Sequence, residues 1–157
     1  MLRHDAVIDL NQDSTLDEIM HLVEMRFGVA PAGWHRESAR LFALDVALTV
    51  IRRNPSLVSE SERHELATRL HEARSLVVGD RDDELGFIQS ALATRLPTAK
   101  TALERHIWLT AIDALLPSPY RSALVSTRNA LKLGATGTFN DVASLLRDRL
   151  AARLDEG

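Results

Sequence analysis

Hydrophobic residues occupy nearly every position between Leu41 and Ile51, and this segment dominates the pattern of the chain. An amphipathic helix carries a polar stripe along one side, and this segment has none. It is also too short to cross a bilayer, which takes about 20 residues. The pattern therefore predicts an interior helix from about Trp34 to Arg53, surrounded by other helices, with Asp45 as the one charge in its apolar part.

The segment Ile107–Leu116 repeats this pattern, with Asp113 as its single charge. Aligning Asp45 with Asp113 also aligns several apolar neighbours, and each segment is followed by a proline break and an amphipathic helix. Two related helical halves would explain this similarity, and so would a shared leucine- and alanine-rich composition. In either case the two segments are predicted to form the interior of the protein.

The other helices are predicted from periodic apolar residues and from start and stop signals. Ser59 with Glu62 three residues later is typical of a capping box. Thr98 is the expected cap of the fifth helix, and Ser118 before Pro119 suits the start of the sixth. Besides the central helix, the predicted ranges are 14–27, 59–78, 83–96, 98–116, 119–133 and 138–154.

Helical periodicity is missing from residues 1–13, which are predicted to form an extended N-terminal arm. Residues 14–157 contain no long or low-complexity linker that would mark a domain boundary. The fold class is therefore predicted to be all-α, a single-domain helical bundle of about seven helices over residues 14–157. Two of these helices are central and apolar all round.

Composition narrows the possible partners. The chain has 157 residues, of which 45% are hydrophobic and 26% charged, which is typical of a folded globular domain. Its net charge of −3 weakly disfavours nucleic acid as a partner, because phosphate binding usually shows a basic excess. No segment reaches membrane-spanning length, so we expect a cytoplasmic protein with no membrane partner. Arginine dominates the basic residues, which suggests a GC-rich, bacterial-type source.

Three residues are candidates for ligand binding. A buried carboxylate is costly unless it is paired or hydrogen-bonded, so Asp45 and Asp113 each have a structural partner or line a pocket. In the second case a pocket between the two central helices would bind a cation or an amine, with His106 as a neighbour two turns before Asp113. Structural pairing with an arginine, a histidine, an indole N–H or a helix end is the favoured alternative.

No catalytic residue, metal site or cofactor is predicted. Glu18 and His21 have the E-x-x-H spacing of di-iron bundles, but those bundles need the motif twice, and a second copy is missing. His64 and His71 are each followed by a glutamate, yet the zinc motif H-E-x-x-H does not occur. The chain contains no cysteine, which excludes thiol nucleophiles, thiolate ligands and disulfides.

The absence of an assembled motif favours a non-catalytic protein–protein interaction or regulatory module. Its partner would be another protein or a second copy of the chain. The alternative is a helical bundle that binds a small ligand or a metal between its two central helices. Binding of nucleic acid through arginine-bearing helices is a third and weaker possibility.

Overall fold

The computed structural model describes residues 33–77 and 81–132 of the chain. The predicted arm at 1–13 and the predicted helices at 14–27 and 138–154 lie outside the described residues. The described part contains five α-helices, one short 3-10 helix and no strand, which confirms the all-α class. The number of seven helices and the arm stay predictions.

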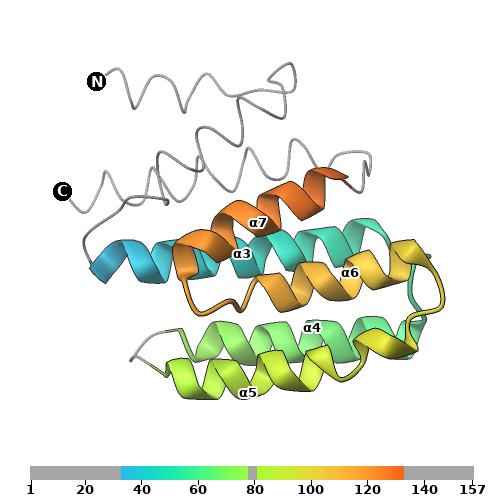
Figure 1. The fold of residues 1–157 in the computed structure, drawn as a ribbon, viewed down its shortest axis with the longest axis horizontal. Coiled ribbons are helices and arrows are strands. Elements are labelled where there is room, and N and C mark those ends of the chain that lie inside the picture. Colours follow the sequence, from blue (N-terminus) through green and yellow to red (C-terminus); the bar gives the residue numbers. More distant parts are fainter. Residues whose placement is uncertain (1–32, 78–80, 133–157) are drawn as a thin grey trace.

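The described helices lie roughly along one axis, and the chain direction alternates from each helix to the next. Figure 1 shows that α3, α5 and α7 point one way and that α4 and α6 point the other. The α4–α5 pair forms one edge of the bundle, and α7 packs across α3 on the opposite side. No described helix is long and apolar enough to cross a membrane. The elements are α3 (Gly33–Arg53), α4 (Glu60–Ser75), α5 (Asp82–Ala93), the 3-10 helix η2 (Leu96–Thr98), α6 (Ala102–Asp113) and α7 (Pro119–Lys132).

The burial predicted for the first apolar segment agrees with the structure. Between residues 41 and 51 no side chain is fully exposed, and Leu44 has no solvent-accessible surface. The second segment, 107–116, is also without a fully exposed residue. However, the pattern placed Asp113 inside a helix that continues to Leu116. In the structure α6 ends at Asp113, so this carboxylate lies at the end of its helix.

The most extensive helix–helix packing joins α3 to α7. Both helices carry small residues at helical spacing in this region, and small side chains allow helices to pack at short interaxial distances. All of these residues are fully buried. They are Ala39, Ala43 and Ala47 on α3, and Ser122, Ala123, Ser126, Thr127 and Ala130 on α7.

Most predicted helix ends agree with the structure. Ser59 caps α4 through a complete capping box with Glu62, in which each side chain bonds the other residue's backbone N–H. The hydroxyl of Ser118 accepts a hydrogen bond from the backbone N–H of Arg121 at the start of α7. These local signals were sufficient because each cap needs only residues within one turn of it.

The boundary predicted between the helices at 83–96 and 98–116 is wrong. The helix α5 ends at Ala93, and Thr98 belongs to η2, where its hydroxyl donates to the carbonyl oxygen of Arg95. The cap of α6 is Thr101, whose hydroxyl accepts from the backbone N–H of Glu104 at 3.0 Å. Thr101 and Glu104 have the spacing of a capping box, and this spacing correctly indicates the start of α6.

Candidate functional site

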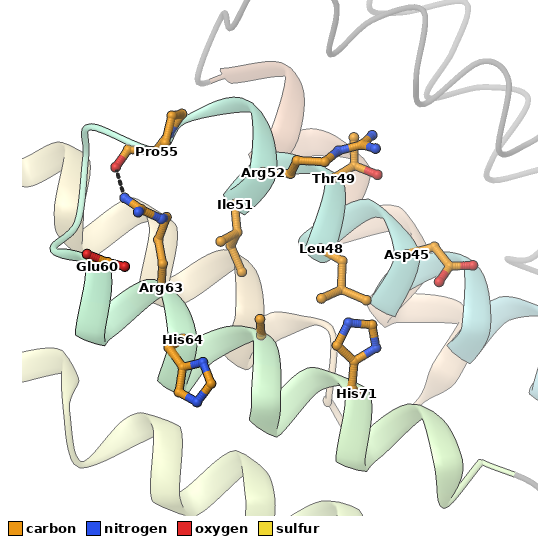
Figure 2. A pocket seen from close by; sticks show the side chains of 11 residues that line it. Asp45, Leu48, Thr49, Ile51, Arg52, Pro55, Glu60, Arg63, His64 and His71 are labelled. Carbon is orange, nitrogen blue, oxygen red and sulfur yellow. Dashed lines mark hydrogen bonds between the residues drawn. The ribbon is translucent and has the colours of Figure 1, made fainter.

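A large hollow among the described residues is a groove between α3 and α4, called here the α3–α4 groove. It has a volume of about 820 Å³ and is open to solvent along one side. Figure 2 shows its walls, which come from the second half of α3, the turn after it and the first three turns of α4. The lining residues are Asp45, Leu48, Thr49, Ile51, Arg52, Pro55, Glu60, Arg63, His64, Ala67 and His71.

Each wall of the groove is a single face of a helix. On α3 the main lining positions are 45, 48, 49 and 52, and on α4 they are 60, 63, 64, 67 and 71. Residues three and four positions apart lie on the same side of a helix, so both sets form a stripe along the groove. Helix α4 faces the groove with this stripe because Leu66, Leu70 and Ala73, on its other side, are buried in the core.

The floor of the groove is apolar and its rim is polar. Leu48 and Ala67 are partly buried on opposite walls, and Ile51 is almost fully buried beneath them. The His71 ring extends from α4 towards Leu48 (Figure 2). At the other end, the guanidinium of Arg63 donates a hydrogen bond to the backbone carbonyl of Pro55 (Figure 2), which ties α4 to the turn after α3.

Asp45 lies at one end of this groove and is paired with a cation. Its Oδ1 accepts a hydrogen bond from Nε of Arg74 at 2.9 Å, and 16% of the Asp45 side chain is exposed. This hydrogen bond raises the pKa of Arg74 above its ordinary value, so Arg74 stays charged at neutral pH. An arginine was among the expected structural partners, and the pair joins α3 to α4.

Asp113 and His106 belong to a different cluster, between α6 and α7. Asn129 on α7 connects them: its side-chain amide donates to Oδ2 of Asp113 at 2.7 Å, and its backbone carbonyl lies 3.0 Å from Nε2 of His106. Because a carbonyl oxygen only accepts, Nε2 of His106 carries the proton. Neither residue lines the α3–α4 groove, so the three predicted site residues do not share that hollow.

Arg40 is a buried cation that the sequence pattern did not single out. Only 3% of it is exposed, and burial lowers its pKa to about 10, so it stays charged at neutral pH. Its Nη1 donates to the carbonyl of Ala114 at 2.8 Å and to Oγ of Ser122 at 2.9 Å, and its Nη2 donates to the carbonyl of Leu116 at 2.6 Å. It therefore satisfies carbonyls left free where α6 ends, a position that favours positive charge.

A smaller hollow of about 250 Å³ lies at the Arg40 end of the bundle. Arg36 and Asp82 both line it, and they form an ion pair with each other at 3.3 Å. The charges of Arg36 and Asp82 at this hollow are therefore matched within the chain. The α3–α4 groove has the larger volume of the two hollows and is the better candidate site.

Metal and cofactor chemistry finds no support among the described residues. In residues 33–77 and 81–132 there is no group of three or more histidine, aspartate or glutamate side chains placed to hold a metal ion. His64 and His71 both line the groove but lie two turns apart on α4. The E-x-x-H pair Glu18 and His21 lies outside the described residues.

Comparison of the chain with protein-family models, with curated proteins and with solved structures finds no match.

Proposed function

We propose that this protein is a non-catalytic interaction module that binds another protein through the α3–α4 groove. The observation that carries the proposal is the groove itself, which combines an apolar floor with a polar rim along two adjacent helix faces. Protein-binding surfaces typically have this arrangement, with an apolar centre surrounded by polar residues.

The chemistry of the groove supports binding over catalysis. Nucleophilic catalysis by a serine, threonine or cysteine needs the hydroxyl or thiol within hydrogen-bond reach of a base. Thr49 is the only hydroxyl among the lining residues, and in the described part of the chain it has no hydrogen bond to His64 or His71. Asp45 is held by Arg74, so its charge is already balanced.

The alternative proposal is a small-ligand site built on Asp45, Asp113 and His106. A groove of about 820 Å³ falls within the usual range for ligand pockets, and Asp45 lines it. The contacts of Asp113 and His106 with Asn129 separate them from Asp45, which weakens a site that needs all three. Ligand binding by these residues stays a prediction.

Several further features belong to the main proposal. They are the complete bundle of seven helices, a cytoplasmic location, a bacterial source, and a partner that is a protein and neither a nucleic acid nor a membrane. A net charge of −3 supports the exclusion of nucleic acid. The preponderance of arginine among the basic residues supports the source.

The proposal is tested by site-specific photo-crosslinking in cells. A photoreactive amino acid replaces Ala67 in the groove, and in a matched control it replaces Ala93, an exposed alanine on α5. We expect a discrete crosslinked protein at position 67 that is absent at position 93 and is lost when Arg52→Glu is added. Identical crosslinking patterns at both positions would contradict the proposal.

A further inference from the structure

We infer that the occupant of the α3–α4 groove is an amphipathic α-helix of another protein, with acidic residues along its edge. This inference rests on the proposed function and specifies the chemistry of the partner. Three features of the described residues lead to it: the shape of the groove, the balance of its charges and the helical secondary structure around it.

The shape of the groove suits a helix. Two neighbouring helices, each with one stripe of side chains along the hollow, leave a trough that a third helix fills in ordinary helix packing. Leu48 and Ala67 on opposite walls provide partly exposed apolar surface at the centre of this trough. Recognition of this type places the apolar face of a partner helix in the groove, with contacts at i, i+3, i+4 and i+7.

The unpaired charge of the groove is positive. Asp45 is balanced by Arg74, whereas Arg52 forms no ion pair within the described residues. Arg63 donates to a neutral carbonyl, so its charge also lacks a carboxylate partner in the described part of the chain. Glu60 is the one acid without such a partner on the rim. Two arginines therefore face one glutamate on this rim, in a chain whose net charge is −3.

Electrostatic complementarity then selects an acidic partner. Opposite charges across an interface favour binding, whereas like charges repel and so disfavour a basic partner. An extended peptide is less suited, since adding a strand needs an exposed sheet edge, and the described residues contain no strand. Nucleic acid is also less suited, because its many phosphates need more cations than Arg52 and Arg63 supply.

The experiment is a selection from a displayed library of random peptides, each about 18 residues or five helical turns long, against the full chain. Selection is repeated against Ala67→Gln, which places a longer polar side chain in the groove, and against the matched control Ala93→Gln. Circular dichroism confirms that both variants fold. We expect enriched peptides with apolar residues at helical spacing and flanking Glu or Asp, retained by Ala93→Gln and lost with Ala67→Gln.

A charge reversal sharpens the result. For one enriched peptide we expect Arg52→Glu to weaken binding roughly tenfold, and Arg105→Glu, a change of an exposed arginine outside the groove, to have little effect. Raising the ionic strength from about 0.1 M to about 1 M shortens the screening length from about 10 Å to about 3 Å and should also weaken binding. Insensitivity to both changes would overturn the acidic character of the partner.

Other outcomes separate this inference from the proposed function. Enrichment of basic peptides, of peptides without helical spacing, or of none would overturn the inference. If the crosslink at position 67 still forms, the interaction module stands with a different kind of partner. If the crosslink joins two copies of this chain, and sedimentation shows a dimer that Ala67→Gln dissociates, the occupant is a second copy and the inference fails. If the peptide selection fails and no crosslink forms at position 67, the proposed function itself is contradicted.

Discussion

The two sides of α3 differ in how they are filled. Towards α7 and the end of α6, small buried residues pack closely, and Arg40 bonds to three groups from these elements. Towards the start of α4, the same helix leaves the α3–α4 groove open to solvent. The comparison shows that a helix with an almost uniformly apolar central segment can have one side packed in the core and another open to solvent.

The largest expected effect is on the closed side. Leu44 has no exposed surface and lies one turn after Arg40 on the same face of α3. Leu44→Ala should lower the free energy of unfolding by roughly 2–5 kcal/mol, because it removes buried apolar surface and leaves a cavity. Denaturant unfolding provides the measurement, with Leu48→Ala on the groove side expected to cost less. A loss below about 1 kcal/mol at Leu44 would contradict its central position.

Removing the buried cation is the next largest change. Arg40→Met preserves much of the side-chain volume but leaves the carbonyls of Ala114 and Leu116 without their donor. We expect a loss of about 1–3 kcal/mol in the free energy of unfolding, the usual cost of buried groups that lose their partner. Arg36→Met is the control, because its ion pair with Asp82 is exposed and such pairs contribute little. Equal effects of the two substitutions would show that Arg40 is not a structural link.

The same substitution in the closed packing of α3 and in the α3–α4 groove tests the comparison directly. Ala43→Gln places a long polar side chain in the closed packing against α7 and should cost roughly 1–3 kcal/mol. Ala67→Gln extends into the open groove and should change stability by less than about 0.5 kcal/mol. Thermal melting of the two variants beside the parent measures both. A large loss from Ala67→Gln would mean that the groove is not open space.

Two serines one turn apart on α7 should respond in opposite directions. The hydroxyl of Ser122 accepts hydrogen bonds from Arg40 and from the backbone N–H of Leu116, so Ser122→Ala should cost about 1 kcal/mol. The hydroxyl of Ser126 is buried and has no partner among the described residues, so Ser126→Ala should leave stability unchanged or raise it slightly. Chemical denaturation of both variants decides the point, and a loss from Ser126→Ala would reveal a partner.

The smallest effects are expected at the two carboxylates that the sequence aligns. Asp45→Asn removes the charge that Arg74 pairs with, and this partly exposed pair is worth about 0.2–1 kcal/mol. In Asp113→Asn the new amide oxygen still accepts from Asn129, so we expect a smaller loss. If thermal melting shows both variants at least as stable as the parent, the carboxylates are not structural and the ligand-site alternative gains.

The sequence was informative wherever structure depends on neighbouring residues. The limits of α3 and the capping box at Ser59 depend on local pattern and were predicted correctly. The start of α6 was misplaced because Leu96-Pro97-Thr98 forms a separate 3-10 turn, which apolar periodicity does not distinguish from a helix end. Periodicity reports which residues are buried, and it is weaker on where each helix ends.

The candidate site was much less predictable. Arg40 falls among polar residues in the first turns of α3, outside the apolar segment that the pattern marks as interior, and its partners lie 74 to 82 positions further along the chain. The pairing of Asp45 with Arg74 spans 29 positions. The groove itself arises from how α3 and α4 pack, and no residue type marks it in the sequence. Sequence reasoning selected Asp45, but it could not separate it from Asp113 and His106.

The long separation between α3 and its main partner has a consequence for synthesis of the protein. Helix α3 is complete at Arg53, whereas α7 ends at Lys132. At a typical translation rate of 5–20 residues per second, roughly 4–16 s pass between the two. During that interval the side of α3 that packs against α7 lacks this partner, and the ribosome-bound chain exposes the apolar residues of that side to the cell. Protease cleavage within α3 of chains stalled before α7 would measure this exposure, and protection equal to that of the complete protein would show that α3 is covered earlier.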